Sequence, residues 1–228
     1  MKPYYQDSHC TIYHGNCFDV LPDLPEIDLI LTDPPYEDEA HIITRRTRAV
    51  LENRKVYADI DFGKMNEETR LFLCEMKCNW LLTFCQAEAV YLYKELLKEK
   101  YRRPMVWIKP DSSPQFTGDR PAMGYESIVA AWCTGGRSKW NAGGKRGVYT
   151  HLGTSGRFGG HPTEKPLKLM IELISDFSLE GLILDPFMGS GTTLRAAKDL
   201  NRKAIGIELE EKYCEIAVKR LQQEVMQF

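Results

Sequence analysis

The chain has 228 residues, of which 43% are hydrophobic and 27% are charged, and its formal net charge is −2. This length suits one α/β domain, residues 1–228, with insertions. The first residues show no basic-then-apolar signal and the apolar runs have strand length, so we expect neither a secretory leader nor a membrane span. Seven cysteines without paired metal spacing favour reduced thiols in a cytoplasm and no metal site. Cys74 and Cys78 are expected to pack on one helix face.

The first elements lead to a short polar motif. Residues 13–21 predict a strand, a turn at Gly15 and Asn16, and a helix. Residues 27–32 are aliphatic and β-branched, which predicts a buried strand that the prolines of Asp33-Pro34-Pro35-Tyr36 must end. The carboxyl end of a strand is where ligands bind in open α/β sheets, so this motif is expected to face a ligand.

This motif suits chemistry on an exocyclic amine of a nucleobase. The amine of adenine or cytosine is a poor nucleophile, because its lone pair is delocalised into the ring. A carboxylate and a backbone carbonyl that accept its two hydrogens would re-aim the lone pair, and a tyrosine ring could stack on the base. The base must then leave the duplex. The candidate catalytic residues are Asp33, Pro34, Pro35 and Tyr36; the alternative is an ordinary turn.

Residues 37–62 are polar and irregular and form the first expected insertion. Residues 41–55 contain five arginines and lysines in total and only one acid. Such a loop contacts phosphates or is simply solvated, and both interpretations stay open. The candidate DNA contacts here are Arg45, Arg46 and Arg48.

Strand and helix patterns then alternate, as in an α/β sheet. Residues 67–78 predict a helix, 80–85 a strand, and the segment through residue 100 a helix. Residues 105–109 and 125–133 predict two further strands, joined by a polar connection at residues 111–123.

Residues 135–160 form the second expected insertion, with five positive charges, no acid, and aromatic rings among glycines. Lysine and arginine neutralise phosphates and rings stack on bases, so this loop is expected to contact DNA. A glycine-rich linker is the alternative. The candidate DNA contacts are Arg137, Lys139, Trp140, Lys145 and Arg146, and Tyr149 is a further ring that could stack.

A second chemical motif follows at residues 182–193, where a strand runs into a glycine loop and a helix start. A P-loop needs lysine after Gly191, and the dinucleotide fingerprint needs a third glycine near Leu194, so both alternatives fail. The next strand, residues 204–208, ends in Glu208 at the separation where a carboxylate meets ribose hydroxyls. Asp185, the loop and Glu208 resemble the S-adenosylmethionine site of class I methyltransferases.

With these residues in view, Asp33-Pro34-Pro35-Tyr36, residues 161–166 (His-Pro-Thr-Glu-Lys-Pro) and residues 185–192 (Asp-Pro-Phe-Met-Gly-Ser-Gly-Thr) resemble the amino-methylating DNA methyltransferases. The order is the β order, in which the catalytic motif precedes the cofactor motif. The resemblance implies an α/β, Rossmann-like fold with a mostly parallel seven-stranded sheet, one antiparallel strand and helices on both faces. It also implies methyl transfer from S-adenosylmethionine to adenine N6 in DNA.

Carried over by position, the resemblance implies a cofactor site of Asn16, Asp33, Thr163, Lys165, Asp185, Phe187, Gly189, Ser190, Gly191, Thr192 and Glu208. Asn16 stands where the family often has an acid, but an amide keeps a donor and an acceptor. DNA is the expected partner, and a homodimer or a restriction partner is compatible with the family. Residues 135–160 leave little room for a recognition domain, so a short or relaxed target site is expected.

Two other functions remain open from the residues. Methylation of the cytosine amine uses the same geometry, although Asp before Pro-Pro is, by resemblance, more typical of adenine enzymes. A catalytically silent subunit that binds DNA or cofactor is the alternative from another class, and an intact Asp33 argues against it.

Overall fold

The computed structural model describes residues 2–20, 24–35, 67–153, 164–178 and 180–223. Tyr36, Arg45, Arg46, Arg48 and Thr163, with the whole insertion at 37–62, lie outside the described residues. None of the described helices is long and apolar enough to cross a bilayer.

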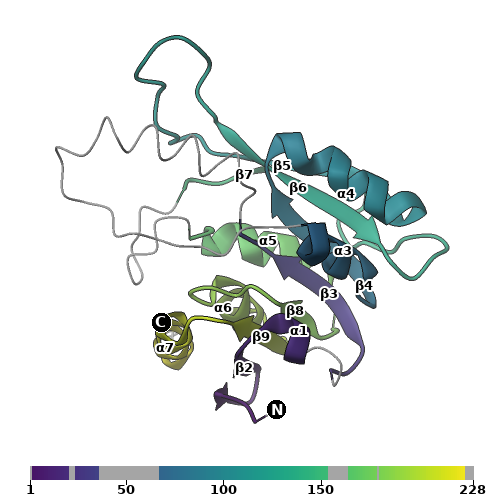
Figure 1. Cartoon of the computed structure of the whole chain (residues 1–228), viewed down its shortest axis with the longest axis vertical. Coiled ribbons are helices and arrows are strands. Elements are labelled where there is room, and N and C mark those ends of the chain that lie inside the picture. Colours follow the sequence, from purple (N-terminus) through teal and green to yellow (C-terminus); the bar gives the residue numbers. More distant parts are fainter. Residues whose placement is uncertain (1, 21–23, 36–66, 154–163, 179, 224–228) are drawn as a thin grey trace.

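One sheet organises the described chain, and in the described residues it has nine strands (Figure 1). Across the sheet they are β1 (Tyr5–Gln6), β2 (Cys10–His14), β9 (Ala204–Glu208), β8 (Ile183–Asp185), β3 (Ile27–Thr32), β4 (Cys78–Cys85), β6 (Tyr125–Trp132), β5 (Tyr101–Ile108) and β7 (Val148–Thr150). Only β1 and β6 run against the other strands. The mostly parallel class is confirmed, while the count of seven was too low because β1 and β7 extend its edges.

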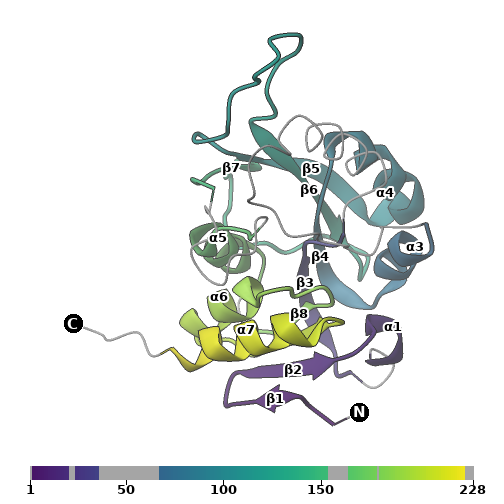
Figure 2. The ribbon, with the colours of Figure 1, turned by 60° about the vertical axis from the view of Figure 1, so that its left-hand side comes forward.

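Helices cover both faces, as expected (Figure 2). The helical elements are α1 (Cys17–Val20), α3 (Glu67–Glu75), η2 (Ala87–Ala89), α4 (Val90–Leu97), η3 (Lys98–Lys100), α5 (Leu167–Phe177), α6 (Thr192–Asp199) and α7 (Glu211–Gln222). The predicted helix over residues 67–78 was too long. Cys78 already begins β4, so Cys74 and Cys78 do not share a helix, although both are buried and all seven thiols are free.

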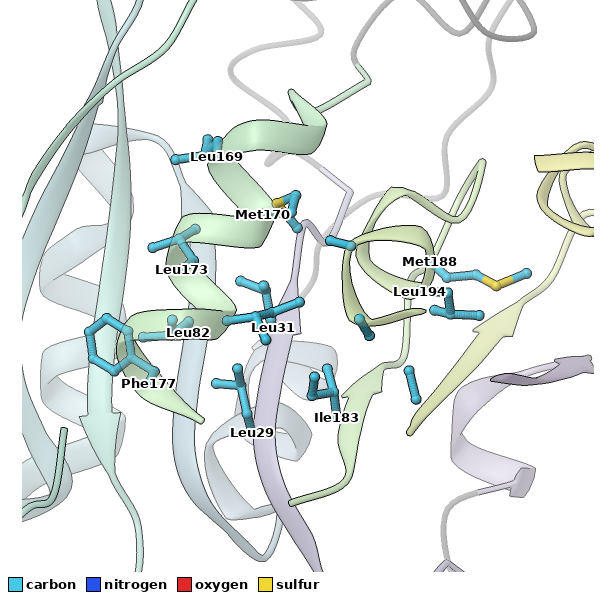
Figure 3. Close-up of a cluster of buried hydrophobic side chains, with 14 of the residues drawn as sticks. Leu29, Leu31, Leu82, Leu169, Met170, Leu173, Phe177, Ile183, Met188 and Leu194 are labelled. Carbon is cyan, nitrogen blue, oxygen red and sulfur yellow. The ribbon is translucent and has the colours of Figure 1, made fainter. Parts of the chain in front are cut away.

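Two apolar cores lie on opposite faces of the sheet, because successive side chains of a strand point to opposite sides. Leu29 and Leu31 of β3 pack with α5 and α6 residues in one core, which also includes Leu173 (Figure 3). Ile30 packs into the other core with Tyr93 of α4. Burial on both faces makes β3 a fully interior strand, and the group that follows it is therefore held firmly.

Direction along the sheet decides where each loop lies. Thr32 of β3 pairs with Thr83 of β4, and Cys85 pairs with Ser127 near the start of the antiparallel β6. The start of β6 therefore lies at the carboxyl edge of the parallel strands. The end of β5 lies there too, because its Ile108 pairs with Tyr125 of β6. The end of β6, where Trp132 pairs with Trp80, lies at the opposite, amino edge.

Candidate active site

Asp33 lies directly after β3 at the carboxyl edge. Its Oδ2 accepts a hydrogen bond from Nζ of Lys165, which comes just before α5. Its Oδ1 is buried and has no hydrogen-bond partner among the described residues. Burial raises the pKa of the Asp33 carboxyl, although the Lys165 ammonium opposes the rise. The site therefore holds a carboxylate with one oxygen neutralised and the other available.

Lys165 links Asp33 to further charges. Its Nζ lies 3.3 Å from Oε2 of Glu126, near the start of β6, and Glu126 forms a second ion pair with Lys109, just after β5. The Lys165 side chain is only 5% exposed. Burial would raise the pKa of Glu126, but Lys165 and Lys109 lower it overall. Lys165 was expected to bind cofactor; in the structure it contacts the carboxylates of Asp33 and Glu126, and its contact with cofactor stays a prediction.

Asp185 ends β8, beside β3, and its carboxylate is committed to the protein. Its Oδ1 accepts hydrogen bonds from Thr32 Oγ1 at 2.8 Å and from the backbone N–H of Phe187 at 3.2 Å. Its Oδ2 accepts from Thr193 Oγ1 at 2.5 Å. Burial raises the pKa of Asp185 to about 6. This residue shapes the loop between β8 and α6 by joining it to β3.

The glycine loop approaches Glu208, at the end of β9. Gly189 and Gly191 have φ values of 50° and 80°, in the left-handed region that favours glycine. A Cβ on Gly189 would meet no atom within 4 Å, so open space lies beside it. The Gly189 N–H donates to Glu208 Oε2 at 2.9 Å, and burial raises the pKa of Glu208. Asn16 lies close by, since the Gly15 N–H donates to the Glu208 carbonyl.

The hydroxyls of the loop have a partner that the sequence did not reveal. Arg220 of α7 donates to Thr192 Oγ1 at 2.6 Å and to Ser190 Oγ at 3.4 Å. It also forms a buried ion pair with Glu164, next to Lys165. Ser190 and Thr192 are both buried, so their hydroxyls support the loop through Arg220. No local pattern signals this contact, because Arg220 lies far along the chain from both partners.

The site thus combines three acids at the carboxyl ends of adjacent strands, an open glycine loop and an available carboxylate oxygen. Asp33, Asp185 and Glu208 end or follow β3, β8 and β9, which are neighbours in the sheet. Phe187, half-buried, packs against the second core beside the loop. These features fit a cofactor with a ribose and a charged end.

Residues 27–219 match the DNA methylase family N6_N4_Mtase. The chain belongs to this family. It is therefore an S-adenosylmethionine-dependent DNA methyltransferase, as the resemblance of its motifs implied.

Several relatives are similar over nearly the whole chain. Type II methyltransferase M.HinfI of Haemophilus influenzae is 28% identical over 266 residues, which span 98% of this chain and 71% of that protein. Type II methyltransferase M2.MboI of Moraxella bovis is 27% identical over 259 residues, spanning 96% and 91%. The crystal structure of the M1.HpyAVI–SAM complex has a TM-score of 0.70 at 26% identity and covers 94% of this chain and 100% of that chain.

The described part of the second insertion begins at the amino edge of the sheet, opposite the edge that holds Asp33. Arg137 and Lys139 follow β6 at the amino edge, where Trp80 donates to the Lys139 carbonyl and Arg102, at the start of β5, to that of Gly136. Trp140 packs against Phe177 at the far end of α5. Antiparallel β6 carries the chain away from Asp33, so the position of Arg137, Lys139 and Trp140 does not favour contact with DNA at Asp33, and their role in DNA binding stays a prediction.

The rest of that insertion packs on α5. Lys145 pairs with Glu172 at 2.7 Å and with Asp176, so its charge is already matched within the protein. Tyr149, expected as a stacking ring, is 1% exposed in β7 and donates to Asp176 Oδ2. Arg146 is exposed. Within the described part of this insertion, Val148–Thr150 form the edge strand β7, and the ion pairs of Lys145 hold the segment before it against α5.

Proposed function

We propose that this methylase transfers the methyl group of S-adenosylmethionine to N6 of adenine in DNA. The carrying observation is the buried Oδ1 of Asp33, which has no hydrogen-bond partner among the described residues and follows β3, the neighbour of β8 in the sheet. An acceptor in that position suits a base amine, and Asp before Pro-Pro is the residue that the resemblance associates with adenine.

S-adenosylmethionine supplies an electrophilic methyl group, and the residues of the chain prepare the amine that attacks it. Oδ1 of Asp33 accepts one N6–H and the carbonyl of Pro34 accepts the other, which directs the nitrogen lone pair at the methyl carbon. Transfer of the methyl group to nitrogen would leave S-adenosylhomocysteine, and the Asp33 carboxylate would take up the proton that the nitrogen loses. Tyr36 is proposed to stack on the extruded base and Thr163 to support the cofactor.

Tritiated S-adenosylmethionine and unmethylated DNA test this assignment. After digestion to nucleosides, the label is expected in N6-methyladenine. Label in N4-methylcytosine would move the assignment to the cytosine amine. No label in DNA from an intact, cofactor-binding protein would instead favour a silent subunit.

Glu208→Ala is expected to weaken S-adenosylmethionine binding by about 1.5–3 kcal/mol, because ribose hydroxyls lose a charged acceptor. The loss of the Gly189 N–H partner loosens the loop as well. Phe187→Ala is expected to weaken binding through lost packing. Calorimetry measures both. Glu210→Ala is the matched control, since Glu210 is a neighbouring acid with a largely exposed side chain. Wild-type affinity in both variants would contradict this placement of the pocket.

We also propose that DNA approaches the carboxyl edge, since the base must reach Asp33. The connection between β5 and β6, residues 110–124, projects from that edge at the top of Figures 1 and 2. Phe116 is 87% exposed and Met123 is 56% exposed there. Exposed apolar side chains at such a site are suited to wedge between bases. Arg120 can neutralise a phosphate, and Arg45, Arg46 and Arg48 remain proposed contacts of the same kind.

Arg120→Ala is therefore expected to raise the Michaelis constant for DNA several-fold and to lower the logarithmic salt slope by about one unit. Its exposed pair with Asp119 contributes little to folding. Arg137→Ala, the same change at the amino edge, is the matched control and is expected to leave both quantities unchanged. The two variants are compared by measuring the Michaelis constant for DNA and the affinity for DNA across a series of salt concentrations. A salt slope of DNA binding that changes in Arg137→Ala and not in Arg120→Ala would place the DNA at the amino edge instead of the carboxyl edge.

A further inference from the structure

Four charged side chains form a chain that ends at the reactive carboxylate. Lys109 pairs with Glu126, Glu126 lies 3.3 Å from Lys165, and Lys165 pairs with Asp33. They come from separate parts of the sequence: the end of β5, the start of β6, the segment before α5 and the end of β3. Their side chains are 24%, 16%, 5% and 24% exposed, in the order Lys109, Glu126, Lys165, Asp33. Such shielded charges interact more strongly than surface pairs.

The ammonium of Lys165 is shared by two carboxylates, and this sharing determines which oxygen of Asp33 is left open to a ligand. Lys165 donates to Oδ2 of Asp33 while Glu126 draws the same Nζ from the other side. Nζ also lies 5.0 Å from the centre of the Phe84 ring, whose face supports the cation. A lysine without the second carboxylate could move between both oxygens of Asp33. Held by Glu126, it leaves Oδ1 open.

We propose that Glu126 is a positioning residue for methyl transfer, which holds Lys165 against Oδ2 of Asp33 so that Oδ1 stays available to the base amine. Lys109 anchors Glu126 from its far side and keeps the acid from approaching Asp33. This inference rests on the proposed role of Asp33 as the acceptor for the amine. It gives Glu126 and Lys109 a function although neither follows from the motifs.

Removing a neighbouring cation and removing a neighbouring anion are expected to shift the pKa of Asp33 in opposite directions. The ionised groups that act on it are Lys165 and Lys109, which lower its pKa, and Glu126, which raises it. Asp185, at the end of β8, is a further acid close enough for Asp33 to act on its pKa. Only the ionised carboxylate of Asp33 can take up the proton that the amine loses, so the pKa of Asp33 sets the acidic limb of the rate profile. Removing a cation must move that limb to higher pH, and removing the anion must move it to lower pH.

The test is the pH profile of single-turnover methylation with saturating cofactor and DNA. Lys165→Met is expected to shift the acidic limb upward by about one pH unit or more, and Lys109→Met upward by less. Glu126→Gln is expected to shift it downward and to lower the plateau rate about tenfold, because Lys165 is then free to occupy both oxygens. Lys165→Arg, which keeps the charge, is expected to restore the limb to near its wild-type position.

Lys198→Met is the matched control, because Lys198 also pairs with an acid, Asp7, but near the amino ends of the strands, at the edge of the sheet opposite Asp33. It is expected to leave the profile unchanged. Should Lys165→Met fail to fold, Glu126→Gln and Lys109→Met still predict shifts of opposite sign. Shifts of one sign, or none, in a protein whose activity requires Asp33 would overturn the positioning role alone. Full activity of Asp33→Ala would overturn the proposed function itself.

Discussion

Asp33→Ala is expected to abolish methyl transfer, with turnover reduced by at least about a thousandfold. The substitution removes the buried carboxylate oxygen that is proposed to accept the base amine. Folding is expected to tolerate the change, because Lys165 keeps its ion pair with Glu126 and is not left as an isolated buried charge. Cofactor binding is expected to stay largely intact, since the carboxylate acts on the base.

Tritium transfer to DNA measures the turnover of Asp33→Ala, and calorimetry measures its cofactor affinity. Asp33→Asn keeps the size but loses the charge, so a severe yet incomplete loss is expected from weaker alignment of the amine. Turnover of the alanine variant within tenfold of wild type would contradict the catalytic assignment. A lost cofactor signal together with lost turnover would move Asp33 into the cofactor site.

Arg220→Met is expected to lower the free energy of unfolding by about 3–5 kcal/mol, the usual effect of removing one partner of a buried ion pair. Arg220 and Glu164 have side chains only 6% and 7% exposed. The change takes the positive charge of Arg220 away from the buried carboxylate of Glu164, and the hydroxyls of Ser190 and Thr192 lose the same donor. Because Glu164 directly precedes Lys165, we also expect turnover to fall.

Urea denaturation provides the measurement for Arg220→Met. The double variant Arg220→Met/Glu164→Gln is expected to recover much of the lost stability, because the buried carboxylate is neutralised together with the cation. Lys212→Met removes an exposed cation from the same helix and is expected to change stability little. A cost below about 1 kcal/mol for Arg220→Met would show that the buried pair does not anchor the segment.

Local patterns were sufficient to predict the elements that carry the acids. The run of aliphatic residues before Asp33 predicted β3 with the bounds Ile27–Thr32 that the structure has. The strand before Glu208 was predicted equally well, at Ala204–Glu208. Strand interiors and proline or glycine boundaries depend on neighbouring residues, so a sequence reveals them directly. The motifs then resembled a family that the match over residues 27–219 confirms.

The sequence by itself therefore determined the fold class and the acids at the ends of its strands, whereas only the tertiary structure decided what these acids contact. Lys165 meets Asp33 across 132 positions of the chain, and Arg220 meets Glu164 across 56. The position of residues 135–142 likewise depended on β6, whose reversed direction carries the chain to the amino edge. Composition marks a loop as basic, but strand direction determines which edge of the sheet it reaches. Contacts between distant residues follow from sheet order and packing, which no local pattern encodes.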